Sequence, residues 1–228
     1  MGTSFPPFPF DLPFGSYFVY PNPQAIANAA DLPTARASRN LVLAVKRDAV
    51  SVEHSPRTLI QIWIEHLAKT IHETPLASLL DGSATIIPMP RSSPSLPKSV
   101  WPALRIADAL VDQGLGAETL PCLRRTTPVP KAAFSRPGER PTPLDHYKSL
   151  GLTLLPGIPG RVILIDDVVT QGAMFSGAFA RLKEVVADVE IVGAFAFART
   201  VPAFNRAIDP CLGRITCSPA GNASSRTP

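Results

Sequence analysis

The chain of 228 residues is 45% hydrophobic and 18% charged, which is typical of one globular α/β domain with a substantial core and leaves little room for two. Its net charge of +4 is small, which argues against a broad nucleic-acid-binding face. The three cysteines (Cys122, Cys211 and Cys217) have no CxxC spacing, so the sequence indicates neither a zinc ribbon nor a disulfide framework and favours a reducing compartment.

No segment of the sequence is typical of a membrane or secreted protein. The first residues lack a basic start followed by an apolar run, so we expect no signal peptide. The longest plausible apolar run, near residues 191–198, is too short to span a bilayer. We therefore expect a cytoplasmic protein without membrane contacts.

Residues 1–40 are rich in proline and aromatic residues, and a disordered tail rarely carries so many aromatic side chains. We expect these residues to form an N-terminal arm packed over its own domain. The alternative is a contact with a partner or with a second copy of the chain, which would make a homodimer. The aromatic residues of this arm are Phe5, Phe8, Phe10, Phe14, Tyr17, Phe18 and Tyr20.

Two elements are predicted after the arm. The apolar residues Leu41 to Val45 are compatible with the first strand of a sheet. Residues Arg57 to Ile71 are predicted to be helical, because their apolar side chains share one face and Pro75 enforces a stop. The shared face consists of Leu59, Ile62, Trp63, Leu67 and Ile71.

A second strand is predicted over Ala84–Ile87, and the turn Pro-Met-Pro-Arg-Ser-Ser follows it at residues 88–93. The prolines make this turn rigid, and Arg91 and Ser92 offer a guanidinium and a hydroxyl group to an anion. A proline-rich turn can equally be purely structural, and both interpretations stay open.

A helix over Val100–Val111 and a strand over Glu118–Leu123 are predicted next. Residues 123–150 then form a basic segment dotted with prolines, and a loop of this length inside a compact domain is often an active-site lid. The excess positive charge suits an anion-binding loop, with Arg124 and Arg125 at its base. The alternative is a solvated linker.

The stretch from Arg161 to Ser176 carries the strongest signal in the chain. Val162 to Ile165 are apolar without alternation, which is typical of a strand buried on both faces of a parallel sheet. Asp166 and Asp167 follow, and two adjacent carboxylates cannot stay unpaired inside such a sheet. They therefore mark the carboxyl end of the strand, where open α/β sheets bind ligands.

A glycine turn and a helix follow the two acids. Thr170 to Ala173 contain Gly172, which lets the backbone approach a ligand closely, and the N–H groups at a helix start favour an anion. Carboxylates that accept hydrogen bonds from hydroxyl groups, followed by a turn whose N–H groups bind phosphate, suit a ribose 5-phosphate as the ligand. The alternative is an ordinary buried strand that ends in a solvated acidic turn. The helix is indicated by Phe175, Phe179, Leu182 and Val186, which fall on one face.

A further apolar strand is predicted over Glu190–Ala198, beside the central strand of the sheet. We expect residues 41–200 to form the folded domain. Residues 201–228 are expected to be a C-terminal tail that is partly disordered, because residues 209–228 turn small and polar.

The run Ile-Asp-Asp-Val-Val-Thr-Gln-Gly-Ala at residues 165–173 resembles the ribose-phosphate signature of the type I phosphoribosyltransferases. The resemblance implies that Asp166 and Asp167 hold the ribose hydroxyls of phosphoribosyl pyrophosphate, with Mg²⁺ held mainly through the substrate. It also implies a parallel sheet flanked by helices with a small irregular cap. The residues that would surround the 5-phosphate are Val169, Thr170, Gln171, Gly172, Ala173 and Met174.

Two positions depart from the family pattern. Gln171 and Met174 stand where small hydroxyl residues are usual, so each loses a hydroxyl contact to phosphate. The backbone N–H groups remain, and Ser176 could supply a hydroxyl nearby.

The wider layout is similar to the competence-type (ComF-like) branch of this family, in which an early Pro-x-Pro turn precedes a variable basic loop. By this resemblance Arg91 and Ser92 would lie in the pyrophosphate loop. The basic segment would close over the pyrophosphate and shield the reacting centre from water. The candidates for that contact are Lys131, Arg136 and Arg140.

The resemblance implies transfer of phosphoribosyl from phosphoribosyl pyrophosphate to a nitrogen nucleophile, with release of pyrophosphate and with Mg²⁺ as the metal. The rival interpretation is a sensor of phosphoribosyl pyrophosphate or of a nucleotide, which the departures at Gln171 and Met174 favour. The acceptor is not readable from the sequence, because its pocket would be built from loops without a recognisable pattern.

Overall fold

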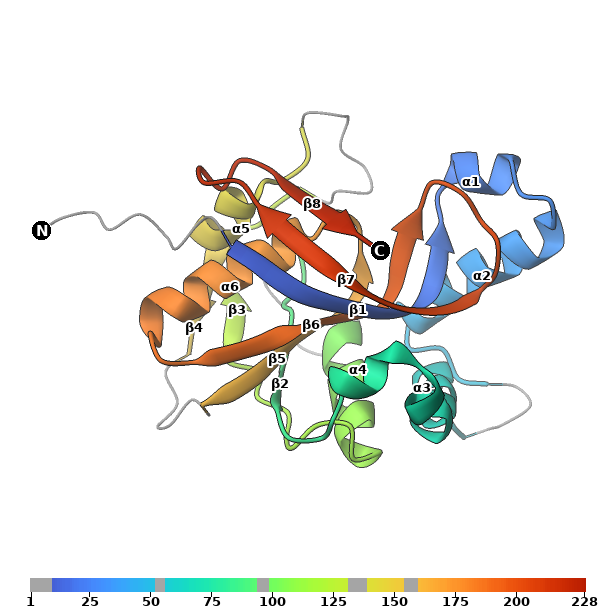
Figure 1. Cartoon of the computed structure of the whole chain (residues 1–228), viewed down its shortest axis with the longest axis horizontal. Coiled ribbons are helices and arrows are strands. Elements are labelled where there is room, and N and C mark those ends of the chain that lie inside the picture. Colours follow the sequence, from blue (N-terminus) through green and yellow to red (C-terminus); the bar gives the residue numbers. More distant parts are fainter. Residues whose placement is uncertain (1–9, 52–55, 94–98, 131–138, 154–159) are drawn as a thin grey trace, which may run out of the picture.

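A six-stranded, mostly parallel sheet forms the centre of the molecule (Figure 1). The computed structural model describes residues 10–51, 56–93, 99–130, 139–153 and 160–228. The strand order is β2-β5-β6-β1-β7-β8; neighbours from β2 to β1 are parallel, and β7 and β8 are each added antiparallel. The strands are β1 (Phe10–Pro21), β2 (Thr85–Pro88), β5 (Arg161–Val169), β6 (Glu190–Val201), β7 (Ile208–Cys217) and β8 (Ser224–Thr227).

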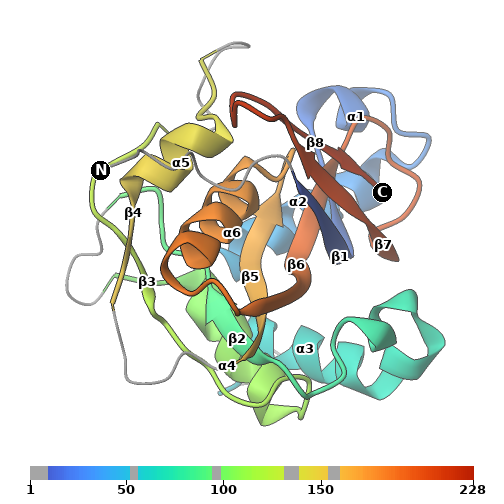
Figure 2. The same cartoon turned by 60° about the vertical axis from the view of Figure 1, so that its left-hand side comes forward.

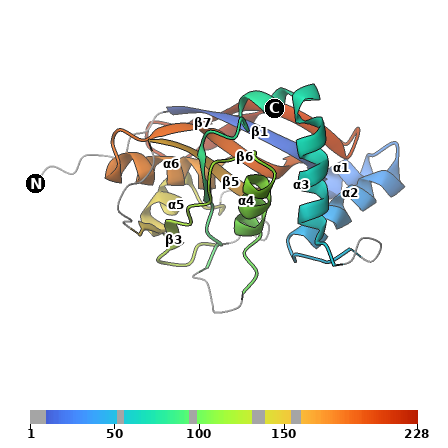
Figure 3. The same cartoon turned by 90° about the horizontal axis from the view of Figure 1, so that it is seen from below.

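Helices cover both faces of this sheet, so the fold is α/β, as the sequence predicted (Figures 2 and 3). On one face, α2, α3 and α4 pack against Tyr17, Phe195 and Phe197. On the other face, α6 packs against Phe14 and Leu164, and α5 packs against α6. The helices are α1 (Pro23–Ala27), α2 (Leu32–Val45), α3 (Leu59–Thr70), α4 (Pro102–Asp112), α5 (Pro143–Ser149) and α6 (Ala173–Val185), with short 3-10 turns η1 (Ile71–Glu73) and η2 (Pro75–Ser78).

A small second sheet lies beside α6. It consists of β3 (Leu123–Arg125) and β4 (Leu150–Leu152), which pair antiparallel. Leu123 and Leu150 are buried in the core that α6 shares with the main sheet. The segment between β3 and β4 contains α5, which begins at a capping box formed by Thr142 and Asp145. Residues 143–150 of the expected basic lid therefore form α5 and the start of β4, beside α6.

The central strand and its helix are confirmed, but β5 continues through Asp166 and Asp167 to Val169, so the two acids do not mark the end of the strand as predicted. Val162 to Ile165 are buried on both faces of β5, and parallel neighbours lie on both sides of this strand. The helix that follows, α6, buries Phe175 and Leu182 against the sheet. The predicted strand at 84–87 and the helices at 57–71 and 100–111 are also confirmed as β2, α3 and α4.

The predicted strand at Leu41–Val45 is wrong, because these residues end helix α2. Asp31 caps the start of this helix through Thr34, and Pro33 occupies its first turn. Val42 and Val45 then lie buried on the face that meets the sheet. The helical period over 32–45 therefore outweighs the local strand preference of five apolar residues.

The interpretation of the N-terminal residues as an arm is wrong for residues 10–21, which form β1 inside the sheet between β6 and β7. Phe14, Tyr17 and Phe18 are buried because they face the two cores. Residues 1–9 lie outside the described part. The expectation of a fraying C-terminus is also wrong, because β7 and β8 pair over residues 208–217 and 224–227.

The strand predicted over Glu118–Leu123 is met only in part. Residues 117–120 run along the free edge of β2: Ile86 N donates to Glu118 O at 2.8 Å, and Leu120 N donates to Ile86 O at 2.8 Å. Pro121 ends this pairing, and β3 begins at Leu123 in the second sheet. No helix in the described residues is long and apolar enough to cross a membrane.

Candidate functional site

Asp166 and Asp167 lie near the carboxyl end of β5, after its four buried apolar residues. Both are half-buried, and the Asp167 side chain is 17% exposed. Asp166 turns one carboxylate oxygen towards its own chain and accepts a hydrogen bond from Asp167 N at 2.8 Å. The pair thus lies at the edge of the parallel sheet where the sequence predicted a ligand.

Burial raises the pKa of Asp166 above its ordinary range, and the neighbouring carboxylate of Asp167 raises it further. Positive charge from Lys46 and Arg125 acts in the opposite direction without cancelling the effect. A ligand that donates hydrogen bonds or carries positive charge stabilises the ionised form of this half-buried carboxyl group. Ribose hydroxyls and a hydrated cation are ligands of this kind.

Lys46 pairs with Asp167 in this site, and the sequence did not indicate it. Its Nζ lies 3.2 Å from Asp167 Oδ1. Burial alone lowers the pKa of Lys46, but the carboxylates of Asp167 and Asp166 outweigh it and raise the pKa above its ordinary value. Because 121 residues separate the two partners, no local signal in the sequence could have found the pair.

The end of α2 places Lys46. The chain leaves this helix through Asp48, which has a left-handed φ of 53°, and Ala49 N donates back to Ala44 O. This is the geometry of a helix C-terminus that usually uses glycine. The Asp48 carboxylate is held by Arg105 Nε of α4 at 3.3 Å, so the turn that carries Lys46 is fixed from a second helix.

The Pro-Met-Pro turn after β2 lies beside the end of β5. Met89 N donates to Ile165 O at 2.8 Å, and Met89 O accepts from Trp101 Nε1 at 2.7 Å. Arg91 and Ser92 follow at once and are half-buried. The structure therefore brings this predicted turn to the residue that directly precedes Asp166.

Arg125 joins the two predicted turns. Its guanidinium donates from Nε to Arg91 O at 3.0 Å and from Nη2 to Met174 Sδ at 2.9 Å. The side chain also donates to Ser149 Oγ and lies 3.5 Å from His146 Nδ1. Arg125 is only 6% exposed, and no carboxylate of the described residues forms an ion pair with it. Burial lowers the pKa of Arg125 to about 10, so the group stays charged at neutral pH.

The turn between β5 and α6 depends on Gly172, whose φ is 87° and which precedes the first residue of the helix. A Cβ at this position would lie 2.6 Å from Ile215 Cγ2, so only glycine fits. Gly172 offers no side chain to cap α6, and no described residue accepts a hydrogen bond from the N–H of Gln171 or of Gly172. These N–H groups are available to an anion.

The side chains around this turn differ in what they can offer a ligand. Thr170 and Gln171 are exposed, whereas Val169 is buried. Ala173 and Met174 are half-buried in the first turn of α6, and the Met174 sulfur is occupied by Arg125. Ser176 is fully buried beside Cys217, so it cannot supply the hydroxyl that the sequence suggested.

The structure describes one of the three candidates from the basic loop. Lys131 and Arg136 lie outside the described residues. Arg140 is exposed ahead of α5, and within the described ranges its side chain has no polar partner. Arg125, which the sequence placed at the base of this loop, is the basic residue that the structure brings between the predicted turns.

The described residues contain no group of three or more His, Cys, Asp or Glu side chains that could hold a metal ion. Asp166 and Asp167 supply two adjacent carboxylates, and Lys46 occupies one of them. This set fits Mg²⁺, which prefers oxygen ligands and keeps several from water and substrate phosphates. It does not fit a metal ion whose ligands must all be protein side chains.

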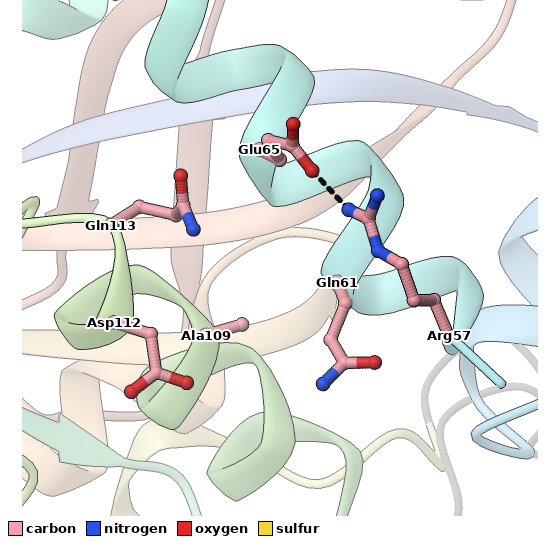
Figure 4. A pocket seen from close by; sticks show the side chains of 6 residues that line it. All are labelled: Arg57, Gln61, Glu65, Ala109, Asp112 and Gln113. Carbon is pink, nitrogen blue, oxygen red and sulfur yellow. Dashed lines mark hydrogen bonds and ion pairs between the residues drawn. The ribbon is translucent and has the colours of Figure 1, made fainter.

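A polar groove of about 280 Å³ lies elsewhere, between α3 and α4 (Figure 4). Arg57, which precedes α3, forms an ion pair with Glu65 on α3, and Asp112 at the end of α4 and Gln113 just after it line the groove as well. The end of α4 leads into residues 117–120 beside the start of β2, where Ala117 N donates to Ala84 O. The groove is therefore at the opposite end of the sheet from Asp166, and none of the predicted site residues lines it.

Comparison with known proteins adds nothing to this geometry. No protein-family model matches the chain, and no curated protein is similar enough to count as a match. The case for a function therefore depends on the site residues themselves and on the resemblance of residues 165–173.

Proposed function

We propose that the chain is a phosphoribosyltransferase with a type I phosphoribosyltransferase-like fold, in which β3, β4 and α5 form the small irregular cap. The observation that carries the proposal is the position of Arg125. This residue donates hydrogen bonds to the carbonyl of Arg91 and to the sulfur of Met174. The guanidinium of one side chain therefore joins the two turns that are expected to bind anions. Asp166 lies close enough to Arg125 for the two charges to interact.

Each part of phosphoribosyl pyrophosphate then has a place in the site. Asp166 and Asp167 accept hydrogen bonds from the ribose hydroxyls. The N–H groups of residues 170–174 bind the 5-phosphate, since they lie at the start of α6 and lack other partners among the described residues. Arg91 and Ser92 bind the pyrophosphate, and Lys131, Arg136 and Arg140 are the candidates for closing over it.

The reaction displaces pyrophosphate from carbon 1 of the ribose by a nitrogen nucleophile. Positive charge develops on the ribose, and the carboxylates of Asp166 and Asp167 stabilise it. Negative charge develops on the leaving group, where the Arg91 turn and the buried charge of Arg125 lie. Asp166 and Asp167 would hold Mg²⁺ mainly through the substrate, and the ion would supply positive charge against the negative charge of the leaving group. The identity of the acceptor is left open by the proposal.

The alternative is a sensor that binds phosphoribosyl pyrophosphate or a nucleotide without turnover. Two observations favour it. Gln171 and Met174 replace small hydroxyl residues, and the Met174 sulfur is already bonded to Arg125. Lys46 binds Oδ1 of Asp167, which leaves fewer acceptor positions of this carboxylate for a ligand. Weaker contacts leave less binding energy for the transition state.

Two measurements test the proposal. Release of pyrophosphate from phosphoribosyl pyrophosphate and Mg²⁺, in a panel of bases and amines, separates the enzyme from the sensor. Saturable binding by calorimetry without release under any acceptor would favour the sensor.

Asp167→Asn tests the site under either hypothesis. It should weaken binding of phosphoribosyl pyrophosphate by about tenfold or more, because hydrogen bonds to a charged group contribute about 1.5–3 kcal/mol. Asp188→Asn is the matched control, since Asp188 is exposed after α6. Affinity that survives Asp167→Asn would count against the assignment of the site.

A further inference from the structure

Arg226 reaches the phosphate turn from the last strand of the sheet, although it lies 56 residues beyond Thr170 in the chain. Its Nε donates to Thr170 O at 3.0 Å, and its Nη2 donates to Thr200 O at 2.8 Å. The guanidinium also lies over the ring of Phe14, with 5.4 Å to the centroid. One side chain of β8 thus connects the carboxyl ends of β5 and β6.

The hydrogen bond to Thr170 O determines where the next N–H points. In a trans peptide the C=O and the N–H point in opposite directions. Because Arg226 holds the carbonyl of Thr170, the N–H of Gln171 is directed away from Arg226 and is not free to rotate. This N–H and that of Gly172 find no acceptor among the described residues.

The charge of Arg226 has no carboxylate partner among the described residues. The charge that acts on it most strongly is that of Arg199, which is buried and already paired with Asp209. Burial, and then the charge of Arg199, lower the pKa of Arg226. Arg199 shares Asp209 with Arg206, so positive charge is in excess around Arg199 and Arg226, beside the turn at residues 170–172. An anion at that turn would relieve the repulsion between them.

We propose that Arg226 is a positioning residue of this site: it fixes the Thr170–Gln171 peptide so that the Gln171 N–H is held ready for the 5-phosphate of the ligand, and its charge acts on that phosphate from the other side of the peptide. The inference rests on the proposed function. It bears on the two departures from the family pattern, since a fixed backbone N–H and a nearby positive charge compensate for the hydroxyl contacts that Gln171 and Met174 cannot make. The C-terminal strand is then part of the ligand site and not only a sheet edge.

The test compares two probes on the full chain by calorimetry: ribose 5-phosphate, which carries only the phosphate in question, and pyrophosphate with Mg²⁺, which belongs to the other turn. Arg226→Met removes the charge and both hydrogen bonds. Arg226→Lys keeps the charge but cannot hold two carbonyls with a planar fork. Arg214→Met is the control, because Arg214 lies on the adjacent strand β7 and pairs with Asp11 at the surface.

The expected result is a loss of about tenfold or more in affinity for ribose 5-phosphate in Arg226→Met and a smaller loss in Arg226→Lys, with pyrophosphate binding unchanged in both. The salt dependence of ribose 5-phosphate binding should also become shallower in Arg226→Met. If Arg226→Met does not fold, Arg226→Lys decides, and its affinity for ribose 5-phosphate alone should fall.

Three results would overturn the inference. Unchanged ribose 5-phosphate affinity in the Arg226 variants would overturn the inference but not the proposed function. Equal losses for ribose 5-phosphate and pyrophosphate would assign Arg226 a merely structural role. A wild-type chain that does not bind ribose 5-phosphate or phosphoribosyl pyrophosphate overturns the proposed function, and the inference with it.

Discussion

At the scale of single residues, the site is a small set of charges that are held in place from a distance. Lys46 and Arg125 lie on opposite faces of the sheet, one after α2 and one in β3, and both act on the carboxyl group of Asp166. Neither position is adjacent to the acids in the chain. The local charge is therefore a product of the fold, and single substitutions can test it.

Lys46→Met should reduce the free energy of unfolding by about 1 kcal/mol at neutral pH, because it leaves the Asp167 carboxylate without the cation that it pairs with. The deficit should be larger above pH 8, because burial and Asp167 raise the pKa of Asp166 to about 8 and the second carboxylate is ionised only above that pH. Urea denaturation at several pH values measures the effect. Lys69→Met is the control, since Lys69 pairs with Glu65 at the surface and its side chain is 70% exposed. Equal losses in both variants would contradict the prediction.

His146 makes the stability depend on acid pH. Burial, followed by the charge of Arg125, lowers the pKa of His146 from 6.5 to about 4. The folded state therefore binds fewer protons than the unfolded state between these values, and stability is lost as the pH falls from about 6.5 to 4. The loss should approach about 3 kcal/mol, at about 1.4 kcal/mol for each pH unit of the shift. His146→Gln should flatten this part of a denaturation profile, and an unchanged slope would contradict the assignment.

At the scale of elements, the turn between β5 and α6 is fixed by packing on β7. Ile215 fills the space in which a side chain at position 172 would lie. Gly172→Ala should therefore lower the free energy of unfolding by about 1–3 kcal/mol, from backbone strain at positive φ and from overpacking. Gly160→Ala is the control, because a Cβ there would meet nothing within 4 Å. Thermal denaturation compares the two, and Ile215→Val should rescue part of the loss.

The elements that could be predicted are those whose signals are local. The buried run at Val162–Ile165, the acids after it and the apolar face of α6 follow from period and composition within 26 residues, since they lie between 161 and 186. The error at 41–45 has the opposite cause, because five apolar residues do not distinguish the end of a helix from a strand. The cap at Asp31 and the proline after it were the signals that identify α2.

The residues that complete the site could not be predicted, because their partners are remote in sequence. The link from Arg125 to Met174 spans 49 residues, and the ion pair of Lys46 with Asp167 spans 121. Such pairs depend on which strands become neighbours. The sequence gives no local indication that β1 inserts between β6 and β7, so the sheet order and the place of Arg226 were both missed.

At the scale of the whole molecule, the C-terminal residues belong to the sheet. Truncation after Cys217 removes β8 together with Arg226, and it should lower both the denaturation midpoint and the affinity for ribose 5-phosphate. Arg226→Met in the full chain is the matched control, because it removes only the side chain. A truncated protein with unchanged stability would mean that β8 contributes no pairing energy.

The position of β1 has a consequence for synthesis of the protein on the ribosome. β1 has one parallel neighbour, β6, which ends at Val201, and one antiparallel neighbour, β7, which ends at Cys217. Until residues 190–217 have left the exit tunnel, β1 cannot pair on both edges, and only helices such as α2 and α3 are available to cover Tyr17 and Phe18. Completion of the sheet thus depends on late, long-range strand pairing, which slows folding. The intermediate that precedes it exposes hydrophobic surface that chaperones would recognise.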